Sequence, residues 1–577
     1  MRGEWPDIPP SALRLPPAAR VPYNSRAMRD DPILEPGPPG PPTSPPPSAW
    51  RTLNAVLLWV GLGIYGLLVW LDLPPPAGTQ YAPPPRGAGR AAAHWWDKAQ
   101  ALRGWSVFPE GWAWPLVDPA PLARWLLLLA LGGLGAIGLA LAERRAARQP
   151  GATPWGALAG LVGLGYALQL ATLWLKQANA VQLLLDRIVN PGFTGFYTFA
   201  LQAPGLSTFF GGYAPAIAIP GACGHCRTHP PGPMLAYWLP LQALEHLPAA
   251  WQQGLSQTLV ALGGLTPPPG PPSATALALL AAHAILLGAA AIVLPLYGLA
   301  RRLAGPALAL RLAALGLMLP GLLLMSPEFD QLYATFAAGL FYVALCGLAA
   351  RRHPGRWGAA AGLCFAGCLY WSFGLALLAV PLGTLAWVQG RPARALDPAP
   401  AQEGAHTVGL RLRQQWGRLP WPWLIGLGIG AAAPWALLWA LGLDLPRVVQ
   451  ITSQAHLQGI TSYRPYAPWL VFNLVDFAQF AGLPLVLASL VTLGGRGPRG
   501  RWLNPYGGLF WAIVLVEDLS GTARAETGRL WVFLLPLALL GLYSAVGQGR
   551  LRGPQITMLL AAQFAVCVLL GGRWLTP

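Results

Sequence analysis

Residues 274–299 read ATALALLAAHAILLGAAAIVLPLYGL, a stretch without a single Asp, Glu, Lys or Arg. A helix needs about 20 consecutive apolar residues to cross the roughly 30 Å of hydrocarbon in a bilayer. No soluble domain would have enough polar surface to cover many such runs. The stretch therefore predicts a transmembrane helix, and the remaining question is how many others accompany it.

Similar apolar runs recur along the whole chain of 577 residues, of which 54% are hydrophobic and only 10% charged. The predicted spans are 53–72, 123–142, 155–175, 274–299, 305–325, 331–350, 357–372, 373–389, 421–442, 469–494, 503–517, 530–546 and 555–572. The 357–389 stretch can be one long or two short helices, and 233–248 is expected to lie in the interface or to re-enter. We thus expect an all-α polytopic membrane protein with about 13 transmembrane helices.

The basic residues indicate topology rather than nucleic-acid binding. The net charge is +17, yet only 2 of the 38 basic residues are Lys, and most of them fall in short clusters between apolar runs. With the N-terminus in the cytoplasm, every short inner loop carries at least two Arg residues, as the positive-inside rule requires. The long loops 73–122, 176–273 and 443–468 then lie on the outer face of the plasma membrane.

Three regions are expected along the chain. Residues 1–50 are rich in Pro and Gly and predict a disordered cytoplasmic tail, with no cleavable signal peptide because the first apolar run is too long for one. Residues 51–154 would form two accessory transmembrane helices with their outer loop, and residues 155–577 the transmembrane core. The chain shows no inverted repeat, the usual sequence sign of a secondary transporter.

The outer loop 176–273 carries the residues best suited to chemistry. Asp186 and Arg187 follow the third span, and His225, Arg227 and His229 precede the pair Pro230–Pro231. A partly desolvated carboxylate can act as a general base toward a hydroxyl acceptor, while cations can hold a departing phosphate. The alternatives are a surface ion pair for Asp186, and metal binding or plain loop polarity for the histidines.

This pattern resembles the first outer loop of the C-type membrane glycosyltransferases (GT-C). The residues that carry the resemblance are Asp186-Arg187, Phe196-Tyr197-Thr198-Phe199-Ala200, and Thr228-His229-Pro230-Pro231-Gly232-Pro233 leading to Tyr237-Trp238. The loop is similar to that of the protein-mannosyltransferase and aminoarabinose-transferase kind, which has an Asp-Glu pair and a Lys-Pro-Pro-Leu motif. In this chain Arg187 replaces the second acid of the pair and His229 replaces the Lys. A bacterial subgroup with His-x-x-Thr-His-Pro-Pro-Gly-Pro and a late Glu-Thr-x-Arg-x-Trp motif is closer still.

The resemblance implies an enzyme that transfers a sugar from a polyprenyl-phosphate donor to a glycan, lipid or protein acceptor at the outer face. Asp186 would be the base, and juxtamembrane helices would line the active-site loop. The implied donor-phosphate or substrate-binding residues are Arg187, Tyr213, His225, Arg227, His229, Arg464, Glu526 and Arg529. No cofactor or metal-ligand set is evident in the sequence, although a divalent metal is left open.

Later loops add further charged residues. Arg464 lies in the outer loop 443–468, followed by Asn473 and Asp476, and Glu526 and Arg529 share a helix face at a spacing of three. A solvated turn with one internal ion pair is the alternative for the last two. Glu328 and Asp330 lie in a short outer loop and can position a sugar or a metal.

Two other functions compete with the transferase. A lipid or glycolipid transporter would use the same outer cations to recruit a headgroup without chemistry. A thiol-redox protein would use Cys223 and Cys226, although prolines flank them and a local disulfide on the oxidising outer face is favoured; a Cys/His metal site is the minor alternative. Asp97, in the Trp-rich loop 73–122, is the reserve candidate for the base.

Overall fold

The structure is a computed structural model. It describes residues 120–149, 152–193, 195–203, 205–219, 223, 225–350, 352–389, 419–458, 464, 466–497, 500–524 and 526–573, all of which belong to one unit, Thr52–Pro577. The predicted tail 1–50, the predicted span 53–72 and Asp97 lie outside the described residues.

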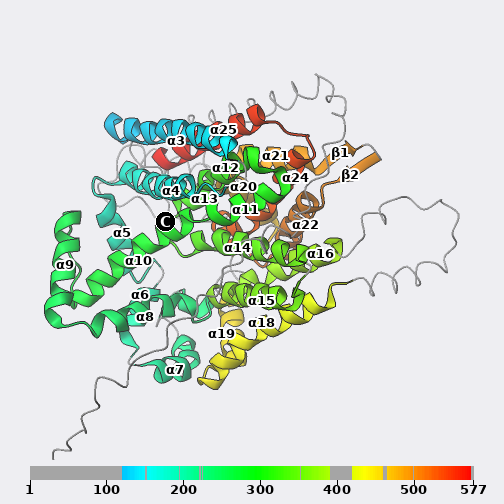
Figure 1. The fold of residues 1–577 in the computed structure, drawn as a ribbon. Helices are drawn as coiled ribbons and strands as arrows, with labels where there is room; N and C mark the ends of the chain where they lie inside the picture. The colour runs from blue at the N-terminus through cyan, green and yellow to red at the C-terminus, as the bar shows by residue number, and fades with distance from the viewer. Residues whose placement is uncertain are drawn as a thin grey trace, which may run out of the picture. The chain divides into compact units, whose positions relative to one another are not determined.

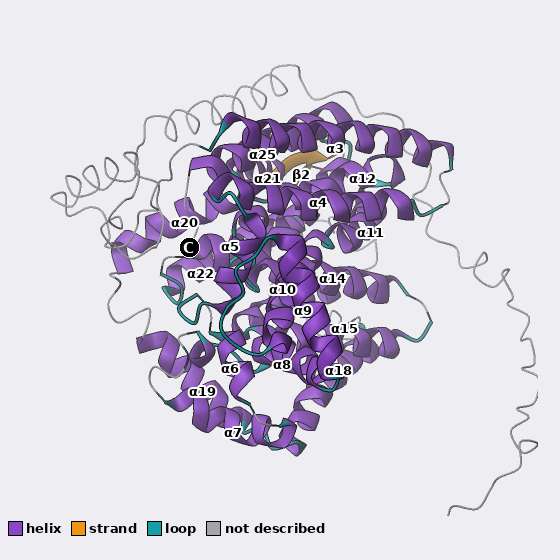
Figure 2. Cartoon of the chain, turned by 90° about the vertical axis from the view of Figure 1, so that its left-hand side faces the viewer, coloured by secondary structure: helices purple, strands orange, loops and turns teal. Residues whose placement is uncertain are grey.

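The described chain is almost entirely helical (Figures 1 and 2). Its first half contains α3 (Leu122–Arg148), α4 (Trp155–Lys176), α5 (Ala180–Val189), α6 (Phe196–Gln202), α7 (Leu206–Ala218), η2 (Cys226–Thr228), α8 (Gly232–Glu245), α9 (Ala249–Gly263), α10 (Pro272–Ala290), α11 (Val293–Ala304), α12 (Pro306–Ala314), η3 (Leu315–Met318), α13 (Pro320–Leu324) and α14 (Asp330–Ala349). Its second half contains α15 (Pro354–Trp371), η4 (Phe373–Leu378), α16 (Ala379–Gln389), α18 (Trp421–Ala440), α19 (Leu445–His456), α20 (Tyr466–Ala481), α21 (Leu483–Leu493), α22 (Pro505–Ser520), α23 (Thr527–Leu530), η7 (Val532–Leu534), α24 (Leu535–Gly547) and α25 (Gly553–Arg573). One antiparallel hairpin, β1 (Gly494–Gly497) with β2 (Gly500–Leu503), joins α21 to α22.

Several described helices are long and apolar enough to cross a bilayer. They are Leu122–Arg148, Trp155–Lys176, Pro272–Ala304, Asp330–Ala349, Trp421–Ala440, Thr527–Gly547 and Gly553–Gly571. The pair α20 and α21, bent by 104° at Gly482, counts as an eighth if it is one broken span. Apolar side chains of α3 such as Leu122 and Leu134 are exposed, as expected for contact with lipid. An all-α polytopic membrane protein is therefore supported, but the count of thirteen spans is not confirmed.

Some predicted spans differ from the helices that form. The apolar run 305–325 is divided into α12, η3 and α13, because Leu319 precedes Pro320 and adopts extended angles (φ −82°, ψ 117°) that interrupt the helix. The stretch 357–389 forms α15 and then η4 with α16, which agrees with the separate spans 357–372 and 373–389. The run 503–517 forms α22, 16 residues long. Apolar composition alone did not predict the interruption at Leu319.

The predicted active-site loop folds into helices with a hydrophobic core of their own. Helix α5 begins at Asn179, whose side chain accepts hydrogen bonds from the backbone N–H groups of Val181 and Gln182, the arrangement that makes Asn a good helix N-cap. Its apolar face, with Leu184, Leu185 and Ile188, packs in the same cluster as residues of α6, α7, α8, α10 and α19. This core fixes the positions from which the charged side chains extend.

Helices α15 and α18 cross at very short range and lie side by side in Figure 1. Gly358 and Gly362 of α15 lie against the backbone of α18 around Leu427, and Gly426 and Gly430 of α18 lie against the backbone of α15 around Ala359. A Cβ added at Gly430 would lie 2.1 Å from the carbonyl oxygen of Ala359. Small residues spaced by four let helix backbones approach closely in membranes, where packing rather than hydrophobicity holds helices together. The close approach therefore depends on glycines of both helices, each packed against the backbone of the other.

Replacing Gly430 with alanine should destabilise the protein by about 1–3 kcal/mol, because the helices must separate to admit the methyl group. Gly428 is the matched control: it lies on the same helix, and a Cβ there meets nothing within 4 Å. Thermal unfolding of the purified protein in detergent would measure both. Equal melting temperatures for Gly430→Ala and Gly428→Ala would contradict the predicted close packing.

Candidate functional site

The segment between α22 and α23 is anchored by a fully buried carboxylate on α20. Oδ2 of Asp476 accepts a hydrogen bond from the backbone N–H of Gly528 at 2.8 Å, and it lies 3.2 Å from the hydroxyl of Thr527. That hydroxyl also donates to the carbonyl of Asn473 at 2.7 Å. These bonds tie the start of α23 to α20, whereas the second carboxylate oxygen, Oδ1, is buried without a hydrogen-bond partner among the described residues.

Glu526 immediately precedes this anchored turn and has an unusual backbone. Its φ is +60°, in the left-handed region that non-glycine residues seldom occupy. Such conformations persist when the surrounding contacts impose them, and they often occur at functional sites. The contacts at Glu526 are ionic.

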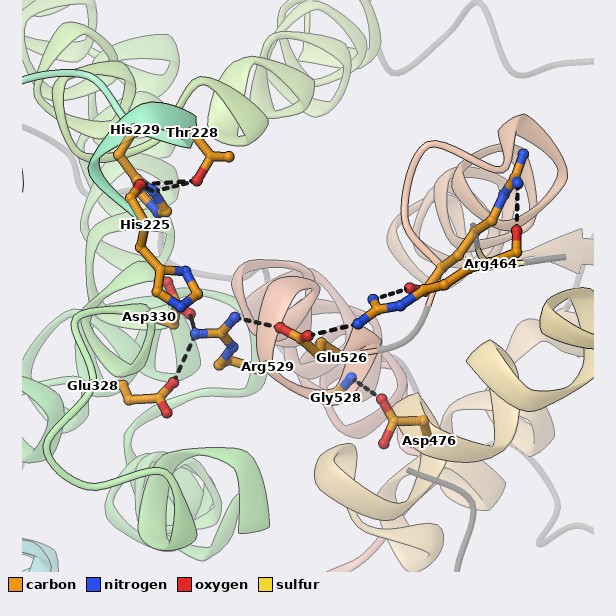
Figure 3. Close-up of polar contacts among 11 residues, drawn as sticks. His225, Thr228, His229, Glu328, Asp330, Arg464, Asp476, Glu526, Gly528 and Arg529 are labelled. Carbon is orange, nitrogen blue, oxygen red and sulfur yellow. Dashed lines mark hydrogen bonds and ion pairs between the residues drawn. The ribbon is translucent and has the colours of Figure 1, made fainter. Parts of the chain in front are cut away.

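Arg529 lies at the centre of three carboxylates that come from two separate segments (Figure 3). One of its terminal nitrogens, Nη1, is 3.2 Å from Glu328 Oε2 and 3.1 Å from Asp330 Oδ2. The other, Nη2, is 2.5 Å from Glu526 Oε2. Glu328 and Arg529 are 201 residues apart in the sequence, so the tertiary fold alone brings them together.

Arg464 completes the arrangement from a third segment. Its Nη2 lies 3.2 Å from Glu526 Oε1, while its Nη1 donates to the carbonyl of Arg524 at 2.5 Å. The guanidinium of Arg524 donates in return to the carbonyl of Arg464 at 2.6 Å. We call Glu328, Asp330, Arg464, Glu526 and Arg529 the ion cluster.

The ion cluster lies at matching ends of three candidate spans. Asp330 begins the span Asp330–Ala349, and Arg529 is in the first turn of Thr527–Gly547. At the end of Trp155–Lys176, Lys176 interacts electrostatically with Glu328. Charged groups next to the ends of membrane-spanning helices usually line a functional cavity or pair with one another.

Arg187 connects α5 to this region. It is buried and donates a hydrogen bond of 2.5 Å from Nη1 to the carbonyl of Ser326, two residues before Glu328. Burial lowers the pKa of Arg187 to about 10, and the nearby Glu328 opposes that change. The guanidinium therefore remains a cation at neutral pH.

The two histidines of the Pro-Pro motif lie next to the ion cluster. His229 is held by hydrogen bonds of its Nδ1 to the carbonyl of His225 at 2.9 Å and to the hydroxyl of Thr228 at 3.0 Å. The Tyr213 hydroxyl donates to the backbone carbonyl of His229 at 2.8 Å. In Figure 3 the His225 ring points toward Arg529 and Asp330.

A disulfide shapes the segment that leads into the motif. Cys223 and Cys226 are bonded to each other, which confirms the favoured local disulfide. Gly195 lies against this disulfide: its φ is +77°, and a Cβ added there would be 2.7 Å from the Cys223 sulfur. The short loop is thus packed directly against the start of α6.

The two glutamates of the ion cluster have very different pKa values. Burial raises the pKa of Glu328 to about 7, although the adjacent Arg529 opposes the rise. Burial acts in the same direction on Glu526, but Arg529 and Arg464 outweigh it and bring the pKa of Glu526 down to about 2. Glu526 is consequently an anion throughout the physiological range, whereas Glu328 can exchange a proton near neutral pH.

Both histidines are neutral in this state. Burial and the charge of Arg529 lower the pKa of His225 to about 4. The pKa of His229 is also below its usual value, chiefly because of burial. A neutral His225 can donate one hydrogen bond to a phosphate, whereas the single ring proton of a neutral His229 is already donated from Nδ1 to the His225 carbonyl. The permanent positive charge comes from the arginines.

The structure gathers some sequence-predicted residues and separates others. Arg187, His225, His229, Arg464, Glu526 and Arg529 meet around Glu328 and Asp330. Asp186 is exposed and accepts a hydrogen bond from Gln182 at 2.7 Å, and no described ion pair joins it to the cluster. Arg227 donates to the carbonyl of Ile217 at 3.1 Å. Tyr213 reaches the motif only through its hydroxyl, which donates to the backbone carbonyl of His229.

Two features of the site were not predicted from the sequence, namely the carboxylates that hold Arg529 and the part played by Lys176. Glu328 and Asp330 were expected to position a sugar or a metal, but in the structure they hold Arg529. The interaction of Lys176 with Arg187 and Glu328 was not anticipated; the available signal was a lysine at the end of a span in a chain that has only 2 Lys residues.

The described residues contain no group of three or more His, Cys, Asp or Glu side chains arranged to hold a metal ion. The three carboxylates that converge here surround a guanidinium instead. Arginines and carboxylates are the charged groups that this site offers to a substrate.

Comparisons with protein-family models, with curated proteins and with solved structures find no match to this chain. The function must therefore be argued from the site itself.

Proposed function

We propose that this protein is a membrane glycosyltransferase that moves a sugar from a polyprenyl-phosphate donor to an acceptor at the outer face of the plasma membrane. The proposal keeps the GT-C-like plan of about 13 spans expected from the sequence. The observation that carries it is the convergence of arginines and carboxylates from four separate segments at matching ends of candidate spans.

The site has the parts that such a transfer needs. A departing lipid phosphate must be stabilised as its bond to the sugar breaks, and arginines match phosphate oxygens in both charge and geometry. His225 lies beside these arginines as a neutral hydrogen-bond donor, and His229 donates its own ring proton to the His225 carbonyl.

Asp186 is the proposed base that takes the proton of the acceptor hydroxyl. It is exposed, so a bulky acceptor can reach it. Its neighbour Arg187 anchors α5 against the loop that carries Glu328. Glu328 itself is 4% exposed and engaged by Arg529, which suits a positioning residue better than a base that must meet a large acceptor.

The test is sugar transfer by the purified chain in lipid nanodiscs. A panel of radiolabelled polyprenyl-phosphate pentoses and hexoses would be offered with envelope lipids and proteins as acceptors. We expect label to move from at least one donor to an acceptor. If no donor is used, and the chain in vesicles instead moves a fluorescent polyprenyl phosphate between leaflets, the transferase proposal fails and a lipid transporter takes its place.

A further inference from the structure

Glu526 is held between two arginines in the way that a phosphate group would be. Its Oε2 is 2.5 Å from Arg529 and its Oε1 is 3.2 Å from Arg464, so each carboxylate oxygen has its own guanidinium. A phosphate group likewise presents separate anionic oxygens, and arginine is the residue that recognises such groups best.

Each guanidinium also has an anchor that does not depend on Glu526. Arg529 is held by Glu328 and Asp330 on the side away from Glu526, and Arg464 by the carbonyl of Arg524. If the Glu526 side chain left, both arginines would keep these partners. The cationic pair is therefore preorganised.

Glu526 is the most accessible member of this group. Its side chain is 31% exposed, against 13% for Arg464 and 14% for Arg529. Because Asp476 fixes Thr527 and Gly528, the Glu526 side chain can turn toward solvent while the start of α23 remains in place. Its left-handed backbone (φ +60°) makes its present conformation costly to hold without the ion pairs.

We propose that Arg464 and Arg529 form a phosphate-binding site, and that the Glu526 carboxylate fills it in the substrate-free chain and is displaced when a phosphate binds. The inference rests on the proposed function, since it names the residues that would hold the donor's phosphate. Glu526 then competes with the phosphate for the guanidiniums of Arg464 and Arg529, and we call it the internal competitor.

The experiment measures phosphate binding without any transfer step. Purified wild type and Glu526→Gln would be placed in nanodiscs, and the Kd for polyprenyl phosphate would be measured, with inorganic phosphate as the competing probe. Removing the internal competitor should lower the Kd by about ten-fold, because the phosphate would no longer have to displace a carboxylate bonded to both guanidiniums. Arg464→Met in the Glu526→Gln background should abolish this gain.

Glu245→Gln is the matched control, because it removes an exposed carboxylate that interacts with Gln242 outside the ion cluster. It should leave the Kd unchanged. Competition by inorganic phosphate would show that the phosphate group alone is recognised, whereas resistance to it would assign the site to the lipid-borne phosphate.

An unchanged or higher Kd in Glu526→Gln, in protein with wild-type thermal unfolding, would overturn the inference, because Glu526 would then be a structural or substrate-binding residue. Glu526→Ala provides a second variant if the amide retains one of the hydrogen bonds. A chain that binds phosphate as expected but transfers no sugar would reject the transferase proposal and keep the phosphate site.

Discussion

Replacing Arg529 with methionine is expected to destabilise the protein by about 3–5 kcal/mol, the cost of removing one partner from a buried ion pair. Methionine fills much of the same volume, but it leaves Glu328, Asp330 and Glu526 without their common counter-charge. Like charges held close together in a poorly solvated site repel one another strongly. Thermal unfolding in detergent would measure the loss, and sugar transfer should be lost with it.

Arg447→Met is the control for Arg529→Met, because Arg447 is exposed and its side chain bonds to Gln450. It should change stability by less than about 0.5 kcal/mol. Adding Glu526→Gln to Arg529→Met should recover part of the lost stability, since one of the uncompensated charges is removed. Wild-type stability of Arg529→Met itself would show that the ion cluster does not hold these segments together.

Replacing Asp186 with asparagine is expected to reduce sugar transfer by about 10²–10⁴-fold, the usual contribution of a positioned general base. The side chain is exposed, and its amide replacement can still bond to Gln182, so protein yield, thermal unfolding and donor binding should stay at wild-type levels. A radiolabelled donor assay with saturating acceptor would separate the chemical step from binding.

Two further variants make the Asp186 prediction decisive. Glu245→Gln, at another exposed carboxylate, should retain full transfer. Glu328→Gln tests the buried carboxylate whose pKa is near 7. Full transfer by Asp186→Asn, together with its loss in Glu328→Gln without loss of stability, would move the base from α5 to the 326–330 loop.

The sequence by itself determined the class of the protein and the segments that carry its charges. Apolar runs such as 274–299 are local, so their length predicts membrane-crossing helices without knowledge of their neighbours. Local chemistry also predicted the pairing of Cys223 with Cys226. The same kind of signal identified Arg464, Glu526 and Arg529 as candidates, because ionisable residues next to spans are few.

Only the tertiary structure decided which of these charges meet. Adjacent residues on a helix point in directions about 100° apart, so Arg187 is buried toward the Glu328 loop while Asp186 remains exposed. No local pattern reveals that Arg529 lies against a loop 201 residues earlier in the chain. The position of Glu526 between two guanidiniums depends on Asp476 and on contacts among three segments, because packing sets distances between segments that a linear pattern leaves open.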